Sequence, residues 1–344
     1  MRRGSERIKI LISDFLNRKR KEIDILSSRS KKEGPSVPVS MESVMDEWLS
    51  DMRRHVRDST FAAYESIVRT HLRPAFGGAP VRTVTETRMA DFLSAESARG
   101  LSSGTLRLTH CVLHMSLRYA ATHGYVSNPP AMPPLPPRPR RAARCLPDRD
   151  LRALEYRLRR SPEPCGIGIL LCIYTGLRVG EVCALRWGDI DPGAGTLTVH
   201  STVQRLRVDG EGGGTRLCFG PPKSPSSLRT IPLPAFLRAE LEPFRAGPDC
   251  FLLTGSSQDF MEPRQLQRRF KAILREVGAA DINFHALRHT FATRCIQLGF
   301  DVKSLSDVLG HADVGTTLNT YVHPSMEQVR GYMEKLSLQD NSQS

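Results

Sequence analysis

A run of prolines near the middle of the chain limits the possible folds more than any other feature. Residues 128–147 read NPPAMPPLPPRPRRAARCLP. Proline has no backbone N–H and restricts both its own φ and the residue before it, so this stretch can form neither a helix interior nor a central strand. It predicts an extended, semi-rigid connector. Because 344 residues predict about two domains, we place a domain boundary here and assign residues 129–147 to the linker.

The residues before the linker have a helical pattern. Between residues 39 and 128, four segments carry apolar residues at helical spacing, and Ser or Thr stands at several of their expected starts. The segments are SVMDEWLSDM, STFAAYESIVRTHLRPAFG, TETRMADFLSAESARG and SSGTLRLTHCVLHMSLRYAATHG. We predict a small four-helix domain over residues 39–128. Residues 1–38 form a basic N-terminal extension, predicted as a short helix and a flexible stretch that contacts DNA backbone or nothing.

The part after the linker mixes helical and strand patterns. DRDLRALEYRLRR and GIGILLCIYTGLRVGEVCALRW predict helices, whereas GTLTVHSTVQRLRVD, GTRLCFGPPK and RTIPLP alternate as strands. The pattern is helical again in RQLQRRFKAILREVG, FHALRHTFATR, DVKSLSDVLG and GTTLNTYV. We therefore expect a mainly α fold with a small antiparallel β portion, in which residues 148–335 form an α+β domain and residues 336–344 a polar tail.

The charge of the chain indicates a polyanionic partner. The formal net charge is +13 and the pI is near 9.7, and nucleic acid is the commonest partner that matches so much positive charge. A basic surface without a partner is the alternative. Four arginines of the linker would bind a DNA backbone that the linker crosses, although a proline ligand of SH3 type is a minor alternative; they are Arg138, Arg140, Arg141 and Arg144.

Two further features narrow the class of protein. The eight cysteines form no CxxC pair and mostly stand among apolar neighbours, which predicts reduced core thiols and neither a zinc site nor a disulfide framework. No apolar run reaches the length of a membrane span, and the N-terminal residues lack a signal-peptide core. We expect a soluble, intracellular protein.

The segment FHALRHTFATR, residues 284–294, concentrates positive charge on one predicted helix. His285 and His289 stand four residues apart, as in a zinc-binding pair. Metalloprotease helices, however, place a Glu directly after the first histidine, where this chain has Ala286. No other cluster supplies an obvious third ligand, so we expect no metal and no other cofactor.

The apolar spacing of this helix orients its charged residues. The predicted buried stripe is Phe284, Leu287, Phe291, Cys295 and Leu298. His285 and Arg288 then lie together along the edge of this stripe and point to a shared cleft, where they are suited to binding an anion. His289 lies on the far side of the stripe, where we predict a structural role. A satisfied pair at the rim of the core is the alternative.

Three other segments carry candidate charged or nucleophilic residues. YTGLRVGEVCALRW places Arg178 in an apolar helical segment, where Glu181 one turn later can pair with it and orient it for an anionic substrate, or form a purely structural pair. Lys223 stands at a turn between two strand-like runs, from which an ammonium can reach a cleft. The helix ending at Gly310 presents His311, and Tyr321 follows ten residues later.

Each of these residues has an ordinary structural explanation when it is considered alone. Their order along the chain, however, resembles that of the signature residues of a known protein family. Arg178, Lys223, the HALR segment, the LGH segment and Tyr321 are similar to the catalytic signature of tyrosine recombinases, the phage-integrase family of DNA breaking and rejoining enzymes. The resemblance covers residues 39–335. It implies that residues 39–128 and the linker clamp DNA and that residues 148–335 form the catalytic domain.

The resemblance implies a role for each matched residue. Tyr321 is the nucleophile and forms a 3′-phosphotyrosyl link that needs no ATP. Arg178 and Arg288 bind the phosphate oxygens, whose negative charge increases as the bond breaks. Lys223 protonates the leaving 5′-oxygen, and His285 helps to deprotonate Tyr321. His311 donates a hydrogen bond to the phosphate, and Glu181 supports Arg178.

Strand exchange implies partners and an assembly. Two duplexes with specific crossover sites and four active sites are required for exchange through a Holliday junction, so a homotetramer on double-stranded DNA is expected. Accessory DNA-bending or directionality factors are further candidate partners, and MEQVRGYMEKLSL is a candidate for exchange between subunits. The expected location is the bacterial cytoplasm, at the nucleoid.

Several functions share this chemistry. The long strand insertion TVQRLRVDGEGGGTRLCFGPPK and the basic extension favour an integrase of a phage or conjugative transposon. The alternatives are a chromosome-dimer resolvase of the same family, a type IB topoisomerase-like enzyme that nicks and closes DNA, and a catalytically silent DNA-binding architectural protein. The target sequence, the direction of recombination and a second DNA site for the N-terminal extension are left open.

Overall fold

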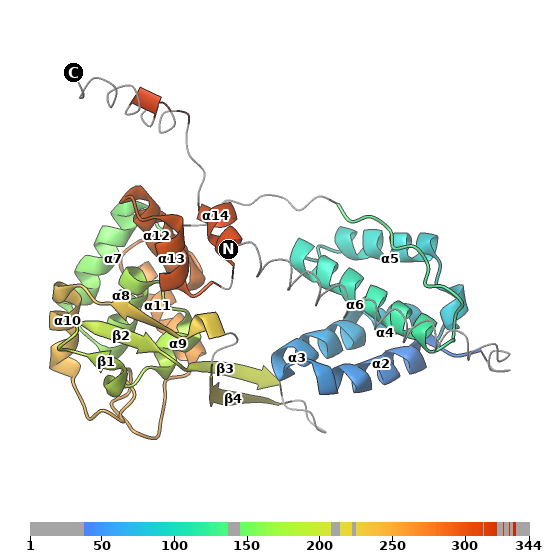
Figure 1. Cartoon of the computed structure of the whole chain (residues 1–344), viewed down its shortest axis with the longest axis horizontal. Helices are drawn as coiled ribbons and strands as arrows, with labels where there is room; N and C mark the ends of the chain where they lie inside the picture. Colours follow the sequence, from blue (N-terminus) through green and yellow to red (C-terminus); the bar gives the residue numbers. More distant parts are fainter. Residues whose placement is uncertain are drawn as a thin grey trace, which may run out of the picture. The chain divides into compact units, whose positions relative to one another are not determined.

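The structure, a computed structural model, divides the chain into two compact units at residues 139 and 140 (Figure 1). It describes residues 38–136, 145–207, 214–221, 225–311 and 313–321, together with Met326, Arg330, Met333 and Glu334. Residues 1–37 of the N-terminal extension, Lys223, the four linker arginines and the whole polar tail, residues 336–344, therefore lie outside the described residues. Each unit is described by itself below.

The first unit is helical. Its elements are α2 (Met41–His55), α3 (Asp58–Ile67), a π-helical turn η1 (Val68–Leu72), α4 (Arg73–Phe76), η2 (Val81–Thr83), α5 (Glu86–Ala98) and α6 (Ser103–Thr122). Hydroxyl side chains begin three of the long helices, since Ser40, Thr85 and Ser102 each accept a backbone N–H from the first turn. The buried face includes Met45, Trp48 and other apolar residues of all four segments with helical spacing.

The second predicted helix of this unit is continuous but irregular. It comprises α3, η1 and α4, and the N–H of Arg73 pairs with the carbonyl of Val68, five residues earlier. Pro74 follows directly and has no N–H to continue the α-helical ladder, which is consistent with the wider register of this turn.

Both described ends of the linker are held by hydrogen bonds within their own unit. In the first unit, Arg107 Nη2 donates to the carbonyl of Pro136 at 2.6 Å and His110 Nε2 to that of Pro133 at 3.0 Å. In the second, the N–H of Leu146 donates to Thr290 Oγ1 at 2.9 Å.

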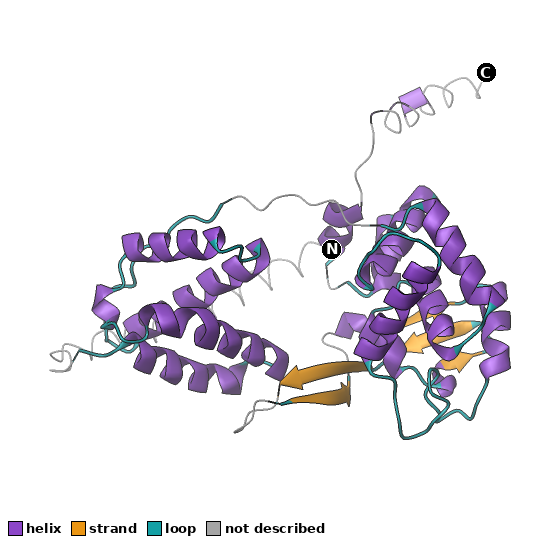
Figure 2. Ribbon diagram, turned by 180° about the vertical axis from the view of Figure 1, so that it is seen from behind, coloured by secondary structure: helices purple, strands orange, loops and turns teal. Residues whose placement is uncertain are grey.

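The second unit surrounds a small sheet with helices (Figure 2). Its helices are α7 (Asp148–Arg160), α8 (Pro164–Thr175), α9 (Val179–Ala184), η3 (Trp187–Asp189), η4 (Pro225–Ser227), α10 (Ala235–Leu241), η5 (Glu242–Phe244), α11 (Pro263–Glu276), α12 (His285–Gln297), α13 (Val302–Leu309) and α14 (Val314–Tyr321). Its strands are β1 (Ile190–Asp191), β2 (Thr196–Val199), β3 (Thr202–Arg207), β4 (Thr215–Gly220) and β5 (Arg229–Pro232). The mainly α fold with a small antiparallel β portion is confirmed.

The strands form two separate antiparallel groups. One sheet has the order β1-β2-β5, with Leu197 opposite Ile231. The other is the β3–β4 hairpin, which pairs Thr202 with Gly220 and extends from the body of the unit in both ribbon views. This hairpin accounts for the strand insertion recognised in the sequence, and β4 leads towards the segment that carries Lys223.

Helix α8 forms the centre of the second core. Nine of its twelve residues are buried, so it has no solvent-facing stripe and its sequence is apolar on all sides. The prediction of one long helix over residues 166–187 is wrong, because α8 ends at Thr175, with Gly176 as its C-cap, and α9 begins only at Val179. Gly176 adopts a left-handed conformation with φ of 66°, which terminates the helix.

The prediction that the cysteines are thiols of the core is only partly correct. Cys172, Cys183 and Cys295 are buried, whereas Cys111 is exposed. Burial raises the pKa of the Cys295 thiol to about 11, so this group is an unreactive part of the core at neutral pH. Within the described ranges, no helix is long and apolar enough to cross a membrane.

Candidate active site

The turn between α8 and α9 positions Arg178 and binds it to Glu181. The backbone N–H of Arg178 donates to one oxygen of Glu181 at 2.9 Å, and its Nη1 donates to the other at 2.7 Å. These two bonds, both donated by Arg178 to the carboxylate three residues later, fix the arginine relative to the start of α9. The Arg178 side chain remains 37% exposed, whereas that of Glu181 is 3% exposed. The predicted pairing of the two residues is thus present, and the guanidinium can still meet a ligand.

Arg229 is a second partner of Glu181 that the sequence interpretation missed. It begins β5, and its Nη1 and Nη2 contact the two carboxylate oxygens of Glu181 at 3.2 and 2.8 Å. Its Nε donates to the carbonyl of Val308 at 2.6 Å, which links β5 to α13. Burial alone would raise the pKa of Glu181, but hydrogen bonds from Arg229 and the charge of Arg178 hold it below its usual value.

Arg288 is buried, which corrects its predicted place at the edge of the helix. It is 2% exposed, and its Nη1 and Nη2 donate to the carbonyls of Gly176 at 2.9 Å and Leu309 at 2.6 Å. These carbonyls end α8 and α13, where helix dipoles favour a cation. Burial and the neighbouring charge of Arg178 nevertheless lower the pKa of Arg288 to about 9, so the group is still charged at neutral pH.

The two candidate arginines meet at one turn of the chain. Arg178 Nη2 lies 3.5 Å from the carbonyl of Gly310, and Arg288 Nη2 contacts the preceding carbonyl, that of Leu309. Gly310 has a left-handed φ of 66°, and a Cβ there would lie 3.0 Å from the carbonyl oxygen of Ser226. The turn between α13 and His311 therefore requires glycine at position 310. This turn places the two carbonyls that the guanidiniums of Arg178 and Arg288 contact.

Positive charge exceeds negative charge at this turn. The described ion pairs and hydrogen bonds of Arg178, Arg229 and Arg288 include one carboxylate, that of Glu181. Grouped guanidiniums in a partly buried place are costly unless an anion compensates them. Each terminal nitrogen of Arg288 carries two N–H groups and uses one in its described bond. The site can therefore bind an anion with several oxygen acceptors.

His311 follows this turn and is held by α14. Its Nδ1 lies 2.7 Å from Oγ1 of Thr317, a fully buried residue. Burial and the charges of Arg288, Arg178 and Arg229 lower the pKa of His311 to about 4, so the ring is neutral at pH 7. When the Thr317 hydroxyl is the donor to Nδ1, the ring proton lies on Nε2, which can then donate to a bound anion.

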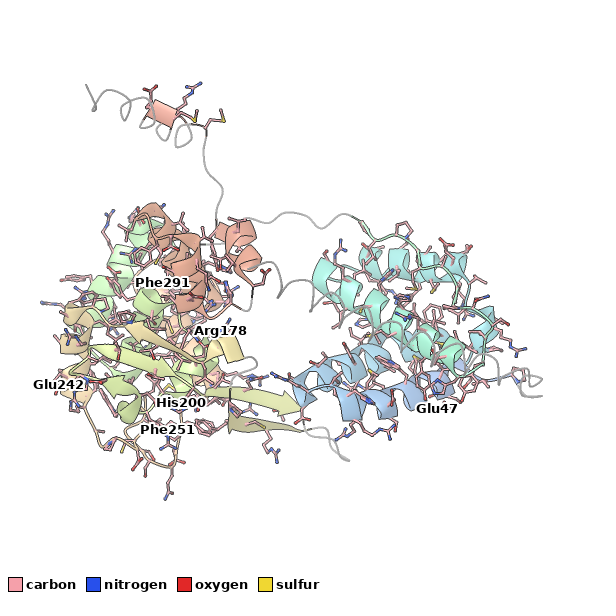
Figure 3. All side chains as sticks on the ribbon, viewed as in Figure 1. Glu47, Arg178, His200, Glu242, Phe251 and Phe291 are labelled. Atoms are coloured by element: carbon pink, nitrogen blue, oxygen red, sulfur yellow. The ribbon has the colours of Figure 1, made fainter. Side chains whose placement is uncertain are left out.

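Tyr321 at the end of α14 packs on α12 and α13. Its ring joins the apolar cluster of Ala292, Cys295, Leu305 and Leu309, together with Phe291 and Ile296. Burial raises the pKa of its hydroxyl, although the charge of Arg288 acts in the opposite direction. Figure 3 shows Phe291 of α12 and Arg178 in the same part of the unit.

His289, and not His285, forms the described hydrogen bond with Tyr321. Nδ1 of His289 lies 2.8 Å from the Tyr321 hydroxyl. His285 instead contacts the ring of His289, edge to face, with centroids 4.7 Å apart. The prediction that His289 lies on the far side in a structural role is therefore wrong in its placement. The predicted stripe is also wrong at its end, since Leu298 is 76% exposed; α12 ends at Gln297, one residue earlier.

The structure thus brings together five of the six matched residues, which are Arg178, His285, Arg288, His311 and Tyr321. Lys223 is outside the described residues. Two neighbours were not predicted as partners, Arg229 and His289. The i, i+4 spacing of the histidines was a signal for His289, whereas nothing local in the sequence connects Arg229 with Glu181, 48 residues away.

Profiles of two family domains match the chain. The profile of the "Phage integrase family" matches residues 153–328, and that of the "Phage integrase, N-terminal SAM-like domain" matches residues 40–96. Among relatives, the tyrosine recombinase XerC-like protein of Caldanaerobacter subterraneus subsp. tengcongensis is 25% identical over 87% of this chain and 83% of its own length. The tyrosine recombinase XerC of Mesorhizobium japonicum is 29% identical over 82% and 91%.

Solved structures share the fold. The Tn1549 transposon integrase in complex with transposon right end DNA aligns with a TM-score of 0.73 and 20% identity, covering 87% of this chain and all of that one. A lambda integrase tetramer bound to a Holliday junction aligns with a TM-score of 0.62 and 17% identity, over 89% of this chain and 86% of that one. Since one family profile spans about half of the sequence and the signature residues meet in space, the chain belongs to the phage integrase family of tyrosine-type site-specific DNA recombinases.

Proposed function

We propose that the protein cuts and rejoins double-stranded DNA through a 3′-phosphotyrosyl link to Tyr321. The observation that carries this proposal is the meeting of Arg178 and Arg288 at the carbonyls of Gly310 and Leu309, next to His311. A DNA phosphate bound there would supply the negative charge that the described residues lack. Planar guanidiniums bind phosphate oxygens with two parallel hydrogen bonds, and the bond strengthens as charge develops on those oxygens.

The assignment of roles follows the chemistry of the reaction. Attack by Tyr321 forms a phosphorus–oxygen bond and releases the 5′-oxygen, which needs a proton; we assign this proton to Lys223. We assign to Nε2 of His311 a hydrogen bond to a non-bridging oxygen, with the Thr317 hydroxyl as the donor to Nδ1. Glu181 and Arg229 hold Arg178 and α13 in place. In the reverse step a 5′-hydroxyl attacks the phosphotyrosyl bond and restores the DNA backbone.

We propose an integrase of a mobile element that works as a homotetramer on two duplexes, with strand exchange through a Holliday junction, in the bacterial cytoplasm. The β3–β4 hairpin and the basic residues 1–38 support this choice, as does the fold shared with a transposon integrase. Accessory factors and exchange of residues 326–338 between subunits belong to the same proposal. Chromosome-dimer resolution is the second candidate, favoured by relatives named XerC.

A covalent-capture experiment tests the reaction and selects the target sequence at the same time. The full chain is incubated with a library of nicked duplexes that carry a randomised core. The nick allows the short cleaved end to diffuse away, so that the covalent adduct cannot be reversed. Protein–DNA adducts are then isolated after denaturation. We expect adducts with a restricted set of sequences and none with Tyr321→Phe. Wild-type protein that binds the library but yields no adduct would identify an architectural DNA-binding protein instead.

The captured sequence separates the finer functions. An integrase site is expected at the ends of a mobile element and at its target, whereas a resolvase site is expected once on the chromosome. Reactions of two captured sites should give recombinants that contain strands of both duplexes. If supercoils are relaxed and no strands are exchanged, the protein is a topoisomerase-like enzyme.

A further inference from the structure

We propose that His289, and not His285, receives the phenolic proton of Tyr321 when that hydroxyl attacks DNA phosphate. The inference rests on the proposed recombinase function and adds a catalytic residue to it. The hydrogen bond of 2.8 Å between His289 Nδ1 and the Tyr321 hydroxyl is the contact that carries it.

The packing of α12 and α14 sets this contact. Tyr321, like Phe291 and Ile296, packs against the buried cluster of Ala292, Cys295, Leu305 and Leu309. The centroid of its ring is 5.5 Å from that of the His289 ring. A catalytic base has to stand within hydrogen-bond reach of the proton that it takes. His289 satisfies this condition, and both rings are partly buried, so solvent has limited access to the bond.

The tautomer of His289 suits a proton acceptor. When the Tyr321 hydroxyl is the donor in this hydrogen bond, Nδ1 of His289 carries the lone pair and Nε2 the hydrogen. Burial and the charge of Arg288 lower the pKa of His289, which keeps the free ring neutral and ready to accept. The negative charge that the phosphate brings to the site would offset Arg288 and increase the basicity of the ring as the reaction proceeds.

The proposed step is balanced. The O–H bond of Tyr321 breaks, its proton passes to His289 Nδ1, and the phenolic oxygen forms a bond to phosphorus. The bond from phosphorus to the 5′-oxygen breaks, and Lys223 protonates that oxygen. During religation the attacking 5′-hydroxyl returns a proton to Lys223, and His289 returns its proton to the departing phenolate.

His285 occupies a less suitable place for this transfer. Its described contact is with the ring of His289, one position further from the phenol. Burial, His289, Arg288 and Arg178 lower its pKa to about 4. The two guanidiniums of the phosphate site both act on His285, which fits a residue that donates a hydrogen bond to the phosphate or positions His289.

The test compares matched variants on α12 in single-turnover cleavage of a duplex captured by the wild-type protein. Asn in His289→Asn can accept the Tyr321 hydrogen bond but cannot take up its proton near neutral pH. We expect His289→Asn to bind DNA normally and to form the covalent adduct about 10² to 10⁴ times more slowly. His285→Asn should lose less. Equal rates for His289→Asn and wild type, or a defect confined to His285→Asn, would overturn the proposal.

A modified leaving group separates the two proton transfers. A 5′-thio substituent leaves without protonation, so it should restore cleavage by Lys223→Ala and leave His289→Asn slow. Restoration of His289→Asn by the same substrate would assign His289 to the leaving group and contradict the inference. Wild-type protein that forms no adduct at all would instead overturn the recombinase function, and this proposal with it.

A measurement without DNA covers the case in which His289→Asn does not fold. Nuclear magnetic resonance of labelled histidine gives the pKa of His289 in wild type and in Tyr321→Phe. A hydrogen bond donated to Nδ1 favours the neutral ring, so its removal should raise that pKa. An unchanged pKa would show that the phenol does not donate to this nitrogen and would refute the proposed transfer.

Discussion

At the scale of single residues, Arg178 and Arg288 carry the same charge in different surroundings. Arg288→Ala would leave a buried space and two unpaired carbonyls at the ends of α8 and α13, which is expected to cost about 2–4 kcal/mol of stability. Arg178→Ala leaves Glu181 paired with Arg229, so about 1 kcal/mol or less is expected. Denaturant unfolding measures both variants, and equal losses would contradict this assignment.

Both arginine variants should also lose activity. Removal of one group that stabilises developing charge typically lowers a rate by about 10² to 10³. For Arg178→Ala this loss should occur in fully folded protein. Cleavage of captured DNA should therefore be measured at a temperature where Arg288→Ala is still folded, so that the loss of phosphate binding is separated from the loss of structure.

His311 predicts a pH dependence of stability. Its folded-state pKa of about 4 lies below the value of about 6.5 for an unfolded histidine. Between these values the unfolded chain binds more protons, so the free energy of unfolding should fall as the pH is lowered from about 6.5 to about 4. His311→Asn should flatten this slope. A slope unchanged in His311→Asn would mean that the folded-state pKa is close to that of a free histidine.

At the scale of elements, the end of α8 links the core to the site. Gly176→Ala places a Cβ 2.6 Å from Cδ1 of Phe291 and 2.8 Å from Cδ2 of Leu309, at a φ of 66°. It should move the carbonyl that accepts from Arg288 and cost about 2–4 kcal/mol, from strain and overpacking together. Thermal unfolding measures this loss.

Gly278→Ala is the matched control for this substitution. Gly278 has nearly the same φ, 64°, but no heavy atom lies within 4 Å of an added Cβ. Its cost should be the backbone strain alone, about 1 kcal/mol. Similar destabilisation by the two variants would show that the close approach of Phe291 and Leu309 contributes little.

The element that departs most from its predicted pattern is α12. Its helical spacing indicated Phe284 and Leu287 as buried, and both are. Arg288 contradicted the pattern because carbonyls from α8 and α13 accept its N–H groups inside the core. A periodic pattern records average burial on one face, whereas a buried cation depends on acceptors from distant segments, which no local spacing contains.

At the scale of the whole molecule, the linker is proposed to bind DNA backbone. Its candidate residues are Arg138, Arg140, Arg141 and Arg144, which lie outside the described residues. Replacement of all four by Gln should reduce the slope of log affinity against log salt by up to about 3.6, at about 0.9 per phosphate contact. Gel-shift titrations at several salt concentrations give the slope.

A control with equal charge removal checks this prediction. Arg149, Arg152, Arg159 and Arg160 lie on α7 and are exposed, and their replacement by Gln removes the same four charges. If this variant reduces the slope as much as the linker variant, the effect comes from total charge and the linker has no special part.

Local chemistry in the sequence was sufficient to predict the helical first unit, the antiparallel strands and the order of the signature residues. Side-chain spacing, hydroxyl caps and backbone restrictions act over a few residues and can be recognised without the fold. Tertiary structure alone decided that Arg229 shares Glu181 with Arg178, that Arg288 is buried, and that His289 meets Tyr321. These pairs join residues separated by 32 to 112 positions, and their contacts depend on how α8, α12, α13, α14 and β5 pack together.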